Sequence, residues 1–208
     1  MSKIAHMMRM AAAGGAGGAS GGVTVTAAGS TGTTSSYPSD IQSGDLLVYV
    51  LWFSGSRGSG GSEPWTNLRN YYSVGNWGGY LAYKFADGTE SGTFPTKYTG
   101  TNFTRSVVFR CTGPFSAAAT VLSDQNAGDT ETISLTSYSA PSVFFSIAAN
   151  STLGQEVTAG TSPTETGTVD LTELKVAYYV QDNDPVSDVT LANPNNTRIN
   201  MIFIGGLT

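Results

Sequence analysis

The sequence predicts an all-β protein, an antiparallel β-sandwich of jelly-roll type that follows a short N-terminal arm. Two observations carry this prediction. Strand-length apolar runs at residues 46–53 and 80–85 each adjoin a Gly/Asp turn. Eight or more short candidate strands, separated by Ser, Gly, Pro and Asn, continue along the chain. A chain of 208 residues has the length of one such domain, so we expect an arm with its tether over residues 1–22 and a single sandwich domain over residues 23–208.

The N-terminal arm is apolar and short. Ile4, Met7 and Met8 are spaced as on one face of a helix, Met10 follows, and residues 14–22 are almost entirely glycine and alanine. The apolar stretch is too short to form a stable helix alone. Two interpretations stay open: a disordered N-terminus, or an arm on a flexible tether that folds against a partner subunit, where methionine adapts to irregular surfaces.

The first part of the body alternates between strands and turns. Residues 23–26 alternate like an edge strand, and residues 46–53 are apolar at every position, which predicts a strand covered on both faces. Residues 54–62 are nearly all Gly and Ser, so we expect a flexible loop there and regard it as a candidate binding loop.

Further strands are predicted from short runs rich in β-branched and aromatic residues. They cover residues 80–85, 94–98, 104–111, 118–122, 130–135, 142–149, 166–171, 174–180 and 199–204. The last of them would hold the C-terminal part of the chain in a sheet.

Composition excludes several classes of function. Only 12% of the residues are charged and the net charge is −5, so the chain has few cations with which to bind the phosphates of a nucleic acid. With one histidine and one cysteine, the chain lacks the residues for a zinc site or for Ser-His-Asp or Cys-His catalysis. The sequence also has no apolar run long enough to span a membrane. We therefore expect no enzyme activity, no cofactor and no metal.

A few polar residues still deserve an interpretation. Asp87 and Glu90 straddle a Gly-containing turn, where carboxylates are expected for local hydrogen bonding. Residues 182–188 form an acidic stretch that is either a solvated turn or a loose calcium loop. Cys111 lies at an alternating position of a predicted strand and is interpreted as a small buried hydrophobic residue.

An aromatic segment is the most plausible ligand surface in the body. Trp65, Tyr71, Tyr72 and Trp77 lie close together in a stretch rich in Gly and Asn. Such rings either cap the open end of the sandwich or offer a surface for stacking on sugars or for protein contact.

The order of these motifs resembles a known family. A Pro-x-x-Ile-x-x-Gly-Asp-Leu-Leu segment at residues 38–47 precedes Trp65, the segment 81–90 ends in Asp-Gly-Thr-Glu, and a later strand ends in Cys-Thr-Gly at residues 111–113. This order is similar to a β-sandwich module of virion proteins in tailed bacteriophages, and the resemblance covers residues 23–208. It implies a structural protein on the surface of the virion and supplies no catalytic residues. The arm departs from the plain module and looks like the arms with which capsid-decorating proteins hold the shell.

These observations lead to two functional expectations. The first is a capsid decoration or cement protein whose arm docks on other virion proteins, foremost the major capsid protein, and which forms a homo-oligomer such as a trimer. The alternative is a tail-fibre or head-fibre module that recognises host-surface glycan through the aromatic segment.

Overall fold

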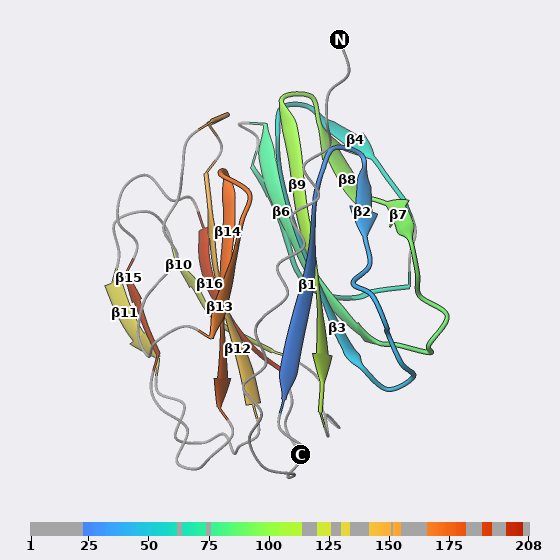
Figure 1. The fold of residues 1–208 in the computed structure, drawn as a ribbon. Coiled ribbons are helices and arrows are strands. Elements are labelled where there is room, and N and C mark those ends of the chain that lie inside the picture. The colour runs from blue at the N-terminus through green and yellow to red at the C-terminus, as the bar shows by residue number, and fades with distance from the viewer. Residues whose placement is uncertain are drawn as a thin grey trace.

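Two antiparallel sheets face each other in the computed structural model, and the antiparallel β-sandwich predicted from the sequence is confirmed (Figure 1). The structure describes residues 23–61, 64–73, 76–113, 120–125, 130–133, 142–150, 152–154, 166–181, 189–192 and 199–205. The arm and tether, residues 1–22, lie outside these ranges, as does the acidic stretch 182–188.

The first half of the chain builds the first sheet. Its strands, in spatial order, are β1 (Thr24–Thr31), β9 (Phe103–Thr112), β3 (Leu46–Ser54), β6 (Trp77–Phe85) and β5 (Thr66–Ser73). The strand predicted at residues 23–26 is the beginning of β1 and lies at an edge, as expected. The apolar strand at residues 46–53 is β3, the central strand of this sheet, and all of its residues are buried.

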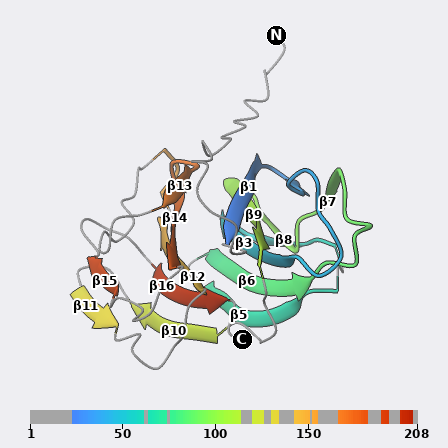
Figure 2. The same cartoon turned by 60° about the horizontal axis from the view of Figure 1, so that its bottom comes forward.

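The second half of the chain builds the second sheet. Its strands, in spatial order, are β10 (Thr120–Gln125), β16 (Ile199–Gly205), β12 (Ser142–Ala149), β14 (Leu174–Gln181) and β13 (Gly167–Asp170). At one side of the sandwich β5 of the first sheet approaches β10 of the second (Figure 2). At the opposite side the edges are β1 and β13, which do not pair with each other.

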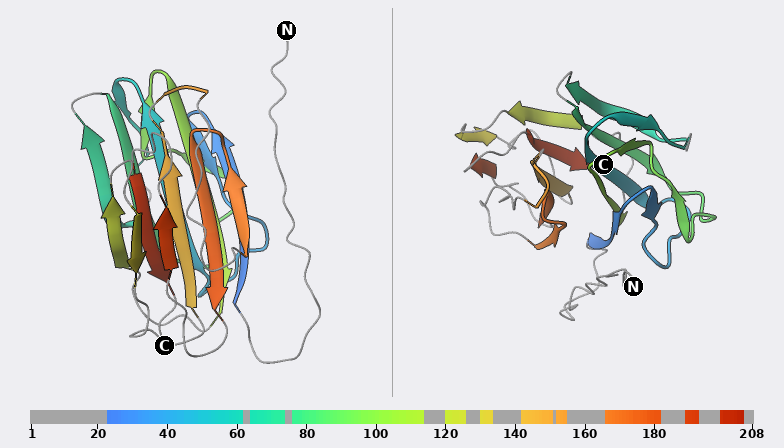
Figure 3. Two further views of the ribbon diagram at one scale, coloured as in Figure 1. Left: turned by 90° about the vertical axis from the view of Figure 1, so that its left-hand side faces the viewer. Right: turned by 90° about the horizontal axis from the view of Figure 1, so that it is seen from above.

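The core lies between the two sheets and follows the alternation of the strands. The inward residues of β3 are Leu46, Val48, Val50 and Trp52, and they belong to one cluster with side chains such as Phe145 of β12 across the interface. The ring of Phe109 lies 4.8 Å from that of Phe145, centroid to centroid, so aromatic packing joins the two layers at the centre. The right-hand view of Figure 3, seen from above, looks along the strands and separates the two layers.

Three two-stranded sheets complete the fold. They are β2 (Thr34–Ser36) with β7 (Thr93–Pro95), β4 (Arg57–Ser59) with β8 (Tyr98–Gly100), and β11 (Thr130–Ile133) with β15 (Val189–Ala192). The first two lie beside the outer face of the first sheet (Figure 1), where Tyr49, Phe53 and Phe94 are buried. This cover explains why residues 46–53 of β3 are apolar at every position: both faces of the strand are removed from water.

The loop prediction for residues 54–62 was wrong in part. Arg57–Ser59 form the strand β4, paired with β8, and the amide of Gly60 donates a hydrogen bond to the carbonyl of Lys97 at 3.1 Å. A Cβ atom on Gly60 would lie 1.6 Å from the carbonyl oxygen of Thr96, so only glycine permits this close approach of the two backbones. Gly60 therefore allows two backbones to pair closely, whereas the Gly- and Ser-rich composition of residues 54–62 had suggested a flexible loop.

Candidate functional site

A groove of about 260 Å³ lies between the edge strands β1 and β13, on the side of the sandwich where the two sheets do not meet. Its walls are mainly apolar, because Val25 and Ala27 of β1 face Val169 and Leu171 from the second sheet. The volume approaches the lower end of the range typical of ligand pockets, about 300 Å³. The groove therefore has room for a few apolar side chains or a small apolar ligand.

The two ends of the groove differ. Near Gly29 the groove is narrow, since a Cβ atom there would lie 3.1 Å from the Cδ2 atom of Leu171. Toward the other end of β1 the ring of Tyr178 forms part of the lining and packs on Phe109 in the core.

One buried polar atom on β13 has no partner among the described residues. It is the hydroxyl of Thr168. A buried hydroxyl without a partner costs free energy, on the order of 1–3 kcal/mol. Thr168 pairs with Ala177 and alternates with the inward-facing Val169, so its side chain lies on the outer face of the second sheet and not in the groove.

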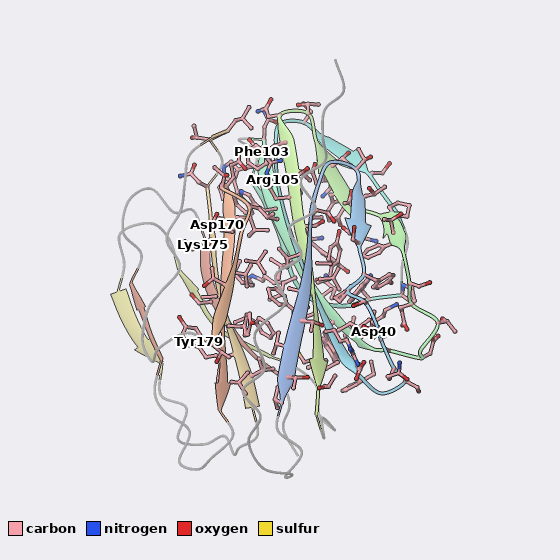
Figure 4. All side chains as sticks on the ribbon, viewed as in Figure 1. Asp40, Phe103, Arg105, Asp170, Lys175 and Tyr179 are labelled. Atoms are coloured by element: carbon pink, nitrogen blue, oxygen red, sulfur yellow. The ribbon has the colours of Figure 1, made fainter. Side chains whose placement is uncertain are left out.

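One end of the groove is held by an ion pair between the two sheets. Arg105 of β9 lines the groove, and its Nε donates to the carboxylate of Glu173 at 2.7 Å and to the carbonyl of Leu171 at 3.3 Å. Figure 4 shows Arg105 toward the same end of the molecule as Asp170 and Lys175. Because the guanidinium is already paired with Glu173, it forms part of the wall of the groove and does not offer a free positive charge to a ligand.

A second polar link lies beside this ion pair. The indole nitrogen of Trp52 in β3 donates to the carbonyl of Asn150 at 2.6 Å, and the amide of Asn150 donates to the carbonyl of Glu173 at 2.9 Å. Trp52, Arg105, Asn150 and Glu173 thus form what we call the inter-sheet clamp. The first two belong to the first sheet, and the other two belong to segments that flank β12 and β14 of the second.

The predicted aromatic surface is divided between two places. Trp65 is half-buried on the outer face of the first sheet, with its ring 5.2 Å from Tyr49 and 5.9 Å from Phe94, centroid to centroid. Trp77 is half-buried and packs on Trp52 of the core at 5.3 Å. The two tryptophans therefore contact different hydrophobic clusters.

The remaining aromatic candidates lie in an edge strand. Tyr71 and Tyr72 belong to β5, where their backbones pair with Gly79 and Gly78 of β6. The indole nitrogen of Trp65 is buried without a hydrogen-bond partner in the described part of the chain. The arm candidates Ile4, Met7, Met8 and Met10 lie outside the described residues.

Burial controls the titration of Tyr49, the residue on which Trp65 packs. Burial raises its pKa from 10.0 to about 12, although hydrogen bonds donated by the Ser35 hydroxyl and the Lys97 amide oppose this shift. The folded protein therefore holds a proton on Tyr49 that the unfolded chain releases. Its contribution to stability is complete below pH 10 and is lost as the pH rises toward 12.

We expect the free energy of unfolding to fall between pH 10 and 12 by up to about 1.4 kcal/mol per pH unit through this group. Urea unfolding at several alkaline pH values measures it. Tyr49→Phe should show a shallower fall than the parent protein. An unchanged slope in that variant would contradict the assignment.

The other polar residues singled out in the sequence act locally. Glu90 accepts hydrogen bonds from the amides of Asp87 and Gly88 and pairs with Lys84 at 3.1 Å, as expected for turn chemistry. Cys111 is buried as predicted, and burial, aided by the nearby charge of Asp45, raises the pKa of its thiol. A thiol that stays protonated is a poor nucleophile.

Two features are absent from the described residues. No group of three or more His, Cys, Asp or Glu side chains is placed to hold a metal ion there. Within the same residues, no helix has the length and hydropathy needed to cross a membrane.

Comparison with known proteins gave no match to a family model, to a curated protein or to a solved structure. The groove was not anticipated from the sequence, because its two walls lie about 140 positions apart along the chain and each alone is an ordinary edge strand. The one local signal is the run of small residues at 27–29 in β1, which leaves space beside the edge.

Proposed function

We propose that this chain is a non-enzymatic structural protein of a bacteriophage virion, namely a capsid decoration or cement protein on the surface of the particle. Its sandwich forms a rigid body, and its N-terminal arm docks on neighbouring subunits, foremost those of the major capsid protein. Homo-oligomers such as trimers fit this role, because the shell is symmetric.

The observation that carries the proposal is that charged side chains of the sandwich domain form ion pairs with one another. Arg105 and Glu173 join the two sheets, while Arg110 of β9 pairs at 2.6 Å with Asp45, just before β3. Lys84 of β6 pairs with Glu90 in the following turn. These side chains are largely removed from solvent, so they stabilise the body rather than present charges to a substrate. The resemblance to virion modules and the apolar arm supply the context.

The test is binding of the purified protein to virus shells without tails. We expect the intact protein to co-sediment with the shells. A full-length variant with Ile4, Met7, Met8 and Met10 replaced by Ser should lose most of this binding, because the apolar contact is removed while the body is unchanged. Deletion of residues 1–22 should have the same effect.

A matched control uses the aromatic candidates. Trp65→Ala and Trp77→Ala should leave shell binding intact if the arm makes the contact. Absence of binding by the intact protein would contradict the decoration role. It would favour the alternative, a tail-fibre or head-fibre module, whose binding to host glycan should then depend on these two tryptophans.

A further inference from the structure

The groove between β1 and β13 has no role in the proposed function, yet its chemistry specifies the kind of ligand that fits. Its lining is mainly apolar, with Val25, Ala27, Val169 and Leu171 among the residues that form it. An unbranched apolar side chain suits such a narrow space, and methionine is the most adaptable of these.

The described part of the chain begins next to this groove. The described chain begins at Val23, one residue before β1, and Val25 and Ala27 of β1 line the groove. The Gly-rich tether, residues 14–22, has nine residues and a root-mean-square span of about 15–18 Å. The eight residues of β1 extend about 27 Å. Residues 1–13 can therefore fold back along the strand that follows them.

Charge also favours contact between the arm and its own body. Residues 1–22 contain Lys3 and Arg9 and no acidic residue, so they carry a formal charge of +2. Since the whole chain carries −5, residues 23–208 carry −7. Asp170, whose side chain is 50% exposed, stands at the rim of the groove. The apolar and basic composition of the arm thus complements an apolar groove in an acidic body.

We propose that the groove between β1 and β13 binds residues 1–13 of the same chain, with the side chains of Met7 and Met8 inside it. The short tether keeps the arm at a high effective concentration, on the order of millimolar, so a weak contact suffices for occupancy. Binding to the chain's own groove is favoured over exchange with a second copy for the same reason. This inference does not depend on the virion assignment. If that assignment holds, the shell and the groove compete for the same apolar residues.

Disulfide trapping in the full-length protein tests this contact. The double variant Met8→Cys, Val169→Cys places one thiol in the arm and one in the groove, since Val169 lines it. A disulfide requires Cα atoms within about 7 Å. The control is Met8→Cys, Thr66→Cys, which moves the second thiol to an exposed threonine of β5 at the opposite edge of the first sheet. The native Cys111 is buried in both proteins.

We expect the intramolecular disulfide at Val169→Cys to form about ten-fold faster than at Thr66→Cys, as measured by non-reducing gels and intact mass. Equal rates at the two positions would overturn the proposal, and so would a disulfide-linked dimer as the main product.

A second set of variants tests the role of the methionines without altering the body. The rate of disulfide formation between Met10→Cys and Val169→Cys should fall to that of the Thr66→Cys control when Met7 and Met8 are both replaced by Asp. Unchanged trapping would show that apolar insertion does not hold the arm. Shell binding is measured in a separate experiment. Absence of trapping in the groove therefore leaves the proposed virion function untouched, and absence of shell binding leaves the groove contact untouched.

Discussion

Replacing Trp52 with Ala is expected to reduce the free energy of unfolding by about 3–5 kcal/mol, the range found for large aromatic residues in protein cores. Trp52 is 2% exposed, packs in the cluster between the sheets, and donates its indole hydrogen to the carbonyl of Asn150 in the second sheet. The substitution leaves a cavity and an unpaired carbonyl at the same place. Because small proteins have total stabilities of about 5–15 kcal/mol, the loss is a large share of the whole.

Chemical unfolding followed by circular dichroism measures this effect, and Trp52→Phe separates its two causes. Phenylalanine fills most of the space but donates no hydrogen bond, so we expect a smaller loss, about 1–3 kcal/mol. Trp77→Ala is the matched comparison, since Trp77 packs on Trp52 but is only half-buried. A Trp52→Ala variant within about 1 kcal/mol of the parent protein would contradict a structural role for the inter-sheet clamp.

Removing the carboxylate of Glu173 is expected to cost a similar amount, about 3–5 kcal/mol, because it leaves a largely buried cation without its partner. The Glu173 side chain is 2% exposed, pairs with Arg105 of the opposite sheet, and accepts a hydrogen bond from the amide of Gly154 at 2.8 Å. Glu173→Ala breaks both contacts. It also frees one end of the groove, where Arg105 is part of the lining.

The control for this prediction is a more exposed ion pair between the adjacent strands β13 and β14, close to Glu173. Lys175 and Asp170 pair at 3.1 Å with side chains that are 26% and 50% exposed, so Lys175→Ala should cost less than about 1 kcal/mol. The loss of unfolding free energy for Glu173→Gln should lie between those of Glu173→Ala and Lys175→Ala, since the amide keeps the size of the side chain and one acceptor oxygen. If urea unfolding shows that Glu173→Ala and Lys175→Ala lower the free energy of unfolding by the same amount, the stabilising role of the inter-sheet clamp is contradicted.

Strands with a strong side-chain pattern were predictable from the sequence. The strand predicted at residues 142–149 has the bounds of β12, and the one at residues 46–53 differs from β3 by a single residue. Both are dense in apolar and β-branched side chains, whose burial decides their conformation locally. Because residues 46–53 are all apolar, the sequence also predicted that this strand is covered on both faces.

Strands without such a pattern were missed. β4 is Arg-Gly-Ser and β2 is Thr-Ser-Ser, and each exists because a partner strand, β8 or β7, lies beside it. β5 is mostly polar along its length and pairs at the edge of the first sheet. In these segments the hydrogen bonds to a distant partner outweigh local propensity, and a single sequence does not reveal that partner.

Composition and the alternation of a few neighbouring residues are enough to predict the all-β class and the buried strands, and the same composition lacks the residues for zinc or triad chemistry. The inter-sheet clamp and the groove depend instead on how the two sheets pack. Trp52 meets Asn150 and Arg105 meets Glu173 across 98 and 68 positions of sequence separation, and Val25 faces Val169 only because two sheets stack. Which edges remain unpaired, and what lies between them, follows from how the layers close, and that is a property of the whole fold.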